Sequence, residues 1–170
     1  MLVAPIIMFV FGKPVLSTLL AGFVLVVFGE AIRVWSAGHL VKSEVLTVSG
    51  PFAHVRNPLY IGSFFITCGY STMTGGWLVW AIVIPLFFAF HGAAVIWEER
   101  FLIEQFGDDF KVYCKRVPRI IPSLSARITS DTHKFSFKQA KLNKEVKTIM
   151  GTVVIVIAFA IKMVLQSFGS

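Results

Sequence analysis

The chain has 170 residues, of which 56% are hydrophobic and only 15% carry a charged side chain. Soluble domains contain about a quarter charged residues, so this composition excludes an ordinary soluble domain and predicts an integral membrane protein. The formal net charge of +7 does not indicate nucleic acid on this apolar background, because the Lys and Arg residues of membrane proteins gather in cytoplasmic loops beside anionic lipid.

Residues 1–28 form the first apolar stretch and contain a single charge, Lys13. A helix that spans the membrane needs about 20 apolar residues. This stretch therefore forms either one long span, kinked at Gly12 and Pro14, or a hairpin of two short helices. It lacks the basic start and the small-residue cleavage site of a signal peptide, and we expect it to be retained as membrane structure.

Helical character continues beyond residue 28, where Glu30 and Arg33 lie three positions apart and therefore on one helix face. A charge pair inside the membrane is costly unless protein or water surrounds it. Two interpretations remain open at this point: a helix end that reaches the headgroups, and a buried functional pair.

Residues 37–58 are polar and are interrupted by glycine and proline, which predicts an irregular connection at the membrane surface. Residues 59–97 are almost uncharged and are divided by Gly75 and Gly76, which predicts two antiparallel helices. Two passes return the chain to its starting side. We therefore expect the 37–58 connection and the segment 98–147 to lie on one face of the membrane, where they can share a site.

Residues 98–147 hold most of the Lys and Arg of the chain, which assigns this face to the cytoplasm. Five lysines recur there at steps of three and four, a pattern typical of an amphipathic helix on anionic lipid headgroups: Lys134, Lys138, Lys141, Lys144 and Lys147. Residues 148–165 are a final apolar span. The chain thus divides into a membrane core (1–123), a basic juxtamembrane segment (124–147) and a C-terminal transmembrane helix (148–170).

Soluble catalytic and nucleotide-binding motifs do not occur: the sequence contains no G-x-G-x-x-G, P-loop, CxxC or HExxH. Cys68 and Cys114 lie in an apolar and a basic stretch and give no disulfide framework. His39, His54 and His91 lack carboxylate or thiol neighbours at metal-ligand spacing, so we expect no metal site.

Two motif clusters flank the predicted hairpin. The first runs from residue 44 to 62 and contains Ser-Gly-Pro-Phe (49–52) and Arg-Asn-Pro-Leu-Tyr (56–60). The second runs from residue 97 to 122 and contains Glu-Glu (98–99), Phe-Gly (106–107) and Val-Pro-Arg (117–119). In this order and spacing the clusters resemble the isoprenylcysteine carboxyl methyltransferase and phospholipid methyltransferase superfamily. The resemblance implies an all-α polytopic membrane protein with about four to five transmembrane helices and a cytoplasmic cofactor pocket.

The same resemblance implies that the pocket holds S-adenosylmethionine. Its expected wall consists of Glu44, Val45, Leu46, Thr47, Phe52, Asn57, Tyr60 and Glu99. A carboxylate such as Glu44 suits the ribose diol, and a guanidinium such as that of Arg56 suits the carboxylate of the cofactor. Aromatic faces suit its cationic sulfonium.

Glu98 and Arg56 are the expected catalytic residues. A carboxylate buried beside the membrane is a usable base toward an ammonium headgroup. A carboxylate acceptor needs no base, and Glu98 would then position it or balance charge. Glu99 points about 100° away from Glu98 on a helix. We expect a supporting or helix-start role for Glu99, together with Arg119.

Two positions depart from the family pattern. Phe52 stands where the family often has Tyr, and Asn57 stands where the eukaryotic carboxyl methyltransferases have His. Asn donates and accepts hydrogen bonds but does not titrate near neutral pH. We therefore expect Asn57 to hold the cofactor and not to act as a base.

The motifs do not choose between two lipidic acceptors, a prenylcysteine-type or other lipid-linked carboxylate and a phospholipid amine. Membrane lipid and anionic headgroups are the expected partners; nucleic acid is not, and the oligomeric state stays open. Two other functions remain as alternatives: a sterol-type reductase that uses NADPH, and a membrane scaffold without enzymatic activity. The scaffold leaves Arg56, Asn57, Tyr60, Glu98 and Glu99 without a role.

Overall fold

The computed structural model describes residues 8–9, 12–41, 45–128 and 134–168. This part of the chain consists of helices and their connections and contains no β-strand, which confirms the predicted all-α fold. The elements in chain order are α2 (Leu16–His39), the short 3-10 helix η1 (Gly50–Ala53), α3 (Pro58–Met73), α4 (Trp77–Arg116), α5 (Phe137–Leu142) and α6 (Glu145–Phe168).

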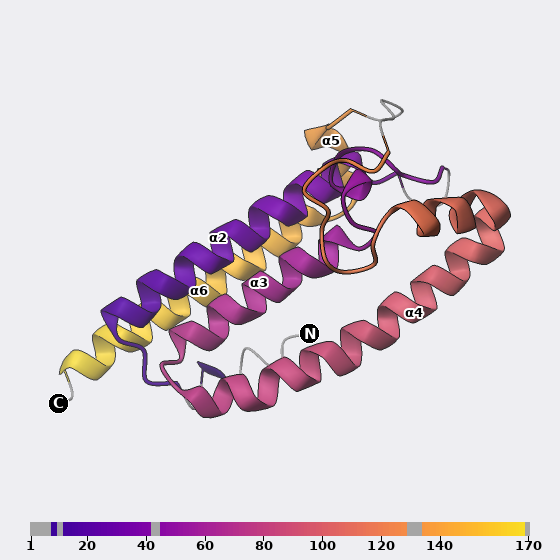
Figure 1. Cartoon of the computed structure of the whole chain (residues 1–170). Helices are drawn as coiled ribbons and strands as arrows, with labels where there is room; N and C mark the ends of the chain where they lie inside the picture. The colour runs from indigo at the N-terminus through magenta and orange to yellow at the C-terminus, as the bar shows by residue number, and fades with distance from the viewer. Residues whose placement is uncertain (1–7, 10–11, 42–44, 129–133, 169–170) are drawn as a thin grey trace.

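Three helices of the described chain are long and apolar enough to cross a membrane: α2, α4 and α6. Helix α3 has 16 residues and is shorter than the roughly 20 residues of a full crossing. Figure 1 shows α2, α3 and α6 side by side, while α4 diverges from them toward its C-terminal end. The protein is therefore an integral membrane protein, and in the described residues three helices, fewer than the predicted four to five, are long and apolar enough for a full crossing.

The first membrane helix begins later than the apolar composition suggests. Helix α2 starts at Leu16, after an extended Val15, and residues 12–15 are not helical. A single helix kinked at Gly12 and Pro14 is therefore not what forms. Residues 1–7 and 10–11 lie outside the described chain, so the question of a second span there stays open.

The predicted helical hairpin is confirmed by α3 and α4. Gly75 makes the turn between them with a φ of +69°, a conformation that glycine adopts without a steric penalty. Helix α4 runs past its expected end at Trp97 to Arg116, and at Gly107 the backbone leaves helical geometry (φ 55°, ψ −123°). Beyond this kink the last turns of α4 curl back toward the end of the bundle where α2 ends and α3 begins (Figure 1).

Helices α2 and α3 pack through glycines on both sides. A Cβ atom on Gly22 would lie 2.5 Å from the carbonyl oxygen of Gly69, and one on Gly29 would lie 2.6 Å from that of Gly62. Neither oxygen can move without moving its helix. Small residues that let two backbones approach are the usual means of helix association in lipid, where burial of apolar surface gives little driving force.

Polar side chains connect α6 to this pair of helices. Arg33 of α2 donates from Nε and Nη2 to the two carboxylate oxygens of Glu145 (2.7 and 3.1 Å) and from Nη1 to Ser63 of α3 (2.6 Å). Glu30 accepts a hydrogen bond from Thr152 of α6 (2.6 Å). Glu30 and Arg33 thus bond side chains of α6 and not each other. Charged groups inside a membrane protein are stable when they have such partners.

The basic segment 134–147 does not form one helix. Helix α5 covers only residues 137–142, and Lys144 takes a φ of 64°, which ends the helix. Helix α6 then begins at Glu145, three residues before the expected start of the last span. The segment nevertheless lies at the same end of the bundle as the 45–57 connection (Figure 1), as the topology predicted.

Candidate active site

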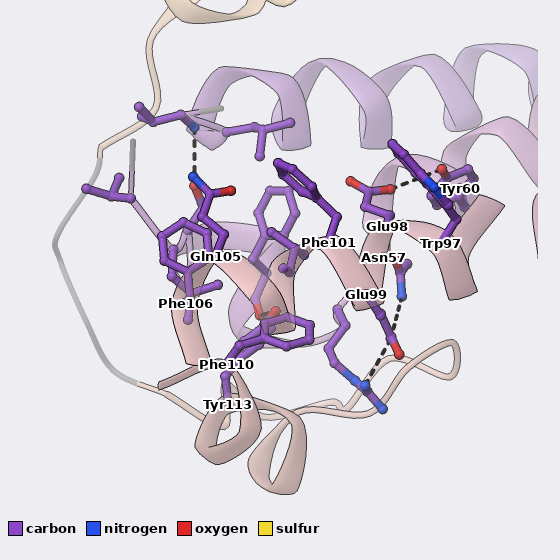
Figure 2. Close-up of a pocket in the computed structure, with 18 of the residues that line it drawn as sticks. Asn57, Tyr60, Trp97, Glu98, Glu99, Phe101, Gln105, Phe106, Phe110 and Tyr113 are labelled. Atoms are coloured by element: carbon purple, nitrogen blue, oxygen red, sulfur yellow. Dashed lines mark hydrogen bonds and ion pairs between the residues drawn. The ribbon is translucent and has the colours of Figure 1, made fainter. Parts of the chain in front are cut away.

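A cavity of about 470 Å³ lies between the 45–57 connection and the second half of α4. This volume falls within the range of small-molecule sites. Nine of the expected site residues line it: Val45, Leu46, Thr47, Phe52, Arg56, Asn57, Tyr60, Glu98 and Glu99. Glu44 lies outside the described residues. The two motif clusters, which are separated by the hairpin in sequence, therefore form opposite walls of one cavity (Figure 2).

The neighbouring carboxylates Glu98 and Glu99 point in different directions. Glu98 is half-buried, and Tyr60 donates a hydrogen bond from its hydroxyl to Glu98 Oε2 at 3.0 Å. Glu99 is 6% exposed and turns away toward the connection that precedes α3. Helical geometry separates consecutive side chains by about 100°, which places the two carboxylates in different surroundings.

Glu99 is shared by two arginines and an asparagine. Arg56 Nη1 donates to Glu99 Oε1 at 2.9 Å, and Arg119 donates to both carboxylate oxygens, its shortest bond being 2.6 Å from Nη2 to Oε2. Asn57 Nδ2 lies 3.5 Å from Glu99 Oε1 and 3.2 Å from the Arg119 carbonyl oxygen. The hydrogen bonds to Glu99 raise the pKa of Arg119 above its ordinary value. Glu99 lies in the middle of α4 and therefore not at a helix start, and it bonds Arg119, the partner expected for it.

One glycine and one tyrosine hold η1, the element that carries Phe52 to the cavity wall. Gly50 takes a φ of +58°, and a Cβ atom there would lie 2.6 Å from His39 Nε2. The ring of His39 thus packs directly on the start of η1. Tyr113, which is 4% exposed, donates from its hydroxyl to the carbonyl oxygen of Phe52 at 2.8 Å. Tyr113 thus bonds the backbone of Phe52, while His39 packs on the residue that begins the same short helix.

Residues 117–128, which follow α4, cross the backbone of residues 53–56. This segment is called the strap. Arg56 donates its backbone N–H to the Pro118 carbonyl oxygen (2.9 Å), and Ser123 donates to the His54 carbonyl oxygen (3.0 Å). Arg127 donates to the Ala53 carbonyl oxygen (2.9 Å). The strap satisfies backbone groups at the end of η1 and in the irregular residues that follow it, and it carries Arg119 to Glu99.

Several residues of the cavity wall were not predicted from the sequence. Besides the motif residues, α4 contributes Ala94, Trp97, Phe101, Leu102, Gln105, Phe106 and Phe110. These residues recur every three or four positions, the spacing of one helix face. That signal was available, but the helix was expected to end at Trp97, so the turns beyond it were not assigned to the wall.

The three candidate histidines each bond a backbone carbonyl. His39 Nδ1 lies 3.0 Å from the Trp35 oxygen, His54 Nδ1 lies 2.8 Å from the Ser123 oxygen, and His91 Nδ1 lies 3.0 Å from the Phe87 oxygen. A carbonyl oxygen accepts only, so each Nδ1 carries the proton. His39 and His91 thus bond carbonyl groups of their own helices, and His54 bonds the strap.

The family comparison agrees with this geometry. The model of the family described as phospholipid methyltransferase matches residues 17–109, more than half of the chain. The chain belongs to the phospholipid methyltransferase family. The matched residues include α2, η1, α3 and α4 as far as the kink at Gly107, and hence both Arg56 and the Glu98–Glu99 pair. The strap, α5 and α6 follow the matched region.

Several relatives share part of this family region. The cobalt-zinc-cadmium resistance protein CzcN of Cupriavidus metallidurans is 32% identical over 75% of this chain and 60% of its own length. The protein-S-isoprenylcysteine O-methyltransferase of Rattus norvegicus is 34% identical over 60% of this chain and 40% of its own length. Methanethiol S-methyltransferase 2 of Bradyrhizobium diazoefficiens is 36% identical over 47% and 30%. This chain therefore spans about a third to three fifths of the length of these relatives, and no solved structure matches it significantly.

Proposed function

We propose that the protein transfers a methyl group from S-adenosylmethionine to a lipidic acceptor at the membrane interface, either a lipid-linked carboxylate or a phospholipid amine. The observation that carries the proposal is the meeting of both motif clusters in one cavity, with Glu98 and Glu99 facing different surroundings. Membership of the phospholipid methyltransferase family and the methyltransferase names of two relatives support it.

The chemistry of the cavity suits the cofactor. Arg56 lines the cavity, and its Nε is buried without a hydrogen-bond partner among the described residues, so this guanidinium has donor capacity for a carboxylate. Thr47 and Asn57 add polar groups, while Phe52, Phe106 and Phe110 add apolar and aromatic surface for a purine. When bound, S-adenosylmethionine supplies an electrophilic methyl group on a cationic sulfonium.

Glu98 and Tyr60 form the polar group that we assign to the acceptor. Arg56 and Arg119 both bind Glu99, whereas among the described residues the hydroxyl of Tyr60 is the donor to Glu98. Glu98 would accept the proton that an ammonium acceptor must lose before methylation. For a carboxylate acceptor no proton is removed, and the Tyr60 hydroxyl would donate to the acceptor and position it. In both cases the protein contributes mainly by holding the acceptor in line.

A lipidic acceptor fits the position of the cavity. The side chains of Trp97 and Phe101 line it, are 71% and 43% exposed, and stack on each other with ring centroids 6.2 Å apart. Both project from a helix apolar enough to cross the membrane. Such aromatic side chains suit the boundary between headgroups and acyl chains. The basic residues at the same end of the bundle support a cytoplasmic orientation of the site.

The test is methyl transfer from labelled S-adenosylmethionine to total membrane lipid, with identification of the labelled product. Labelled methanol released by base indicates a methyl ester and hence a carboxylate acceptor, and a base-stable headgroup label indicates an amine. Binding of S-adenosylhomocysteine and of NADPH to the purified protein separates the methyltransferase from the reductase. If the protein binds neither ligand and labels no lipid, the proposal is refuted and the non-enzymatic scaffold is the function that remains.

A further inference from the structure

The segment 134–147, here called the basic turn, presents five exposed lysines at the cavity end of the bundle. They are Lys134, Lys138, Lys141, Lys144 and Lys147. Its one acidic residue, Glu145, is 3% exposed and is neutralised by Arg33. Across the described chain, none of the five lysines forms a salt bridge. The surface of the basic turn is therefore strongly positive.

Apolar side chains are exposed between these lysines. Phe137 is 75% exposed, Leu142 is 65% exposed and Val146 is 46% exposed. Lysines beside exposed aromatic and aliphatic residues match a headgroup layer, where the charges meet phosphates and the apolar groups enter the acyl boundary. The turn leads directly into α6, a helix apolar enough to cross the membrane. We therefore expect the turn to lie close to the headgroups, whose charge acts over roughly 8 Å at physiological salt.

The opposite side of the basic turn caps the end of α2. Gln139 Nε2 donates to the Leu40 carbonyl oxygen (2.9 Å), and Asn143 Nδ2 donates to the carbonyl oxygens of Ala37 (2.8 Å) and Leu40 (2.7 Å). The last carbonyl groups of a helix lack partners within it, and here the basic turn supplies them. Leu40 and Val41, which follow α2, line the cavity.

A second route leads from the basic turn to the cavity through aromatic rings. Phe135 fills the space beside Gly38, where a Cβ atom would lie 2.3 Å from the Phe135 ring, and its centroid is 5.9 Å from that of His39. His39 packs on Gly50 at the start of η1, and η1 carries Phe52 into the cavity wall. A displacement of the basic turn therefore changes two parts of the cavity wall, the residues that follow α2 and Phe52 on η1.

We propose that the basic turn docks on anionic lipid of the membrane that holds the protein, and that this contact fixes the adjoining cavity wall in its ligand-binding arrangement. The docking rests on charge complementarity and on the position of the turn. Its effect on ligand affinity rests in addition on the proposed function. The lipid composition of the membrane thereby regulates the site.

The experiment uses the full chain in nanodiscs of phosphatidylcholine alone and of phosphatidylcholine with one third phosphatidylserine. Amide hydrogen exchange of residues 134–147 and 37–41 is measured, together with the Kd for S-adenosylhomocysteine. We expect anionic lipid to slow exchange in both segments and to lower the Kd several-fold. Because each lysine near an anionic surface contributes about a fivefold factor in association, Lys138→Gln with Lys141→Gln should remove most of both responses.

Two further variants separate docking on lipid from its effect on ligand affinity. Lys115→Gln with Arg116→Gln removes the same charge from exposed positions at the end of α4 and should respond to anionic lipid like the wild type. Gln139→Ala with Asn143→Ala keeps every lysine but removes the cap on α2 and leaves the contact of Phe135, so lipid should still slow exchange in the basic turn but lower the Kd less than in the wild type.

The outcomes also separate this proposal from the proposed function. Slower exchange in anionic nanodiscs without ligand binding in either membrane supports the docking surface and counts against the methyltransferase. Equal exchange in both nanodiscs, or a lysine variant that responds like the wild type, overturns the docking surface. Lipid-dependent exchange with an unchanged Kd overturns the regulation of the site.

Discussion

The interface between α2 and α3 and the cavity beside their ends are held together by opposite means. At the interface, four glycines bring two backbones together, so that carbonyl oxygens occupy the space where side chains would begin. At the cavity, one buried carboxylate, Glu99, binds two arginines and an asparagine from segments 20 to 43 positions away. We therefore expect the interface to be sensitive to side-chain volume and the cavity to be sensitive to side-chain charge.

This difference follows from the two environments. Within lipid, apolar surface is already solvated, so helices associate where their shapes match closely. At the membrane surface the connections are irregular, and buried charged groups are stable only when each has a partner. Substitutions at the two regions should therefore have separable effects on folding, on ligand binding and on turnover.

The largest effect is expected for Glu99→Gln. Removal of the carboxylate charge leaves Arg56, whose side chain is only 14% exposed, without its ion-pair partner; loss of one member of a buried pair costs about 3 to 5 kcal/mol. Arg119 is half-exposed, so water compensates much of its share. Thermal unfolding in detergent should show the loss, whereas Glu104→Gln, an exposed position on the same helix, should not. Equal unfolding temperatures would show that Glu99 does not hold the cavity together.

Arg56→Ala should act on ligand affinity. Truncation of one partner of a buried charge pair costs roughly 2 to 5 kcal/mol, and we expect a loss of this size in the binding of S-adenosylhomocysteine, measured by calorimetry. Glu99 keeps Arg119 in this variant, so the fold should survive. Normal affinity with lost turnover would instead place Arg56 on the acceptor side.

Glu98→Gln should remove turnover without unfolding the protein. A positioned acid or base contributes about 10²- to 10⁴-fold in rate, so the labelled methyl assay should show a loss of at least about 100-fold for an amine acceptor. The thermal unfolding temperature should stay near that of the wild type, because Glu98 has a single hydrogen bond from Tyr60 and no ion pair among the described residues. Full activity would remove Glu98 from the site.

Gly62→Ala tests the interface between α2 and α3. The added Cβ atom would lie 2.6 Å from the Gly29 carbonyl oxygen and 2.5 Å from Arg33 Cγ. Overpacking of this kind costs about 1 to 3 kcal/mol, which a lower unfolding temperature should reveal. Gly151→Ala on α6, where a Cβ atom meets nothing within 4 Å, is the matched control and should be neutral or stabilising. If both variants unfold alike, close backbone packing is not what holds α2 to α3.

The smallest effect is expected for Asn57→His. Asn57 donates to the Arg119 carbonyl oxygen and approaches Glu99, and an imidazole N–H can replace one of these donors. We expect the affinity for S-adenosylhomocysteine to change by less than about 1 kcal/mol, the worth of one neutral hydrogen bond. A large gain in turnover would indicate that this position acts as a base when it can titrate.

The cavity-forming segments were predictable because their signals are local. Pro58 starts a helix and Gly75 permits a turn, and charged residues are conspicuous in an apolar chain. Their partners were less accessible to prediction. Arg56 could serve a ligand or a carboxylate 43 positions away, and only the fold shows that Glu99 lies 2.9 Å from it. The wall beyond Trp97 was missed because the helix was expected to end there.

By itself, the sequence determined that this is an all-helical membrane protein with a hairpin whose two flanking motif clusters face the same side. Hydrophobic content, turn residues and the parity of membrane crossings are enough for that. The tertiary structure decided that Arg33 binds Glu145 across 112 positions and that Glu98 and Glu99 separate into two environments. It also decided that the basic turn caps α2. Each of these depends on how a helix is rotated and docked against its neighbours, and close packing of side chains across elements sets that rotation, which no local pattern encodes.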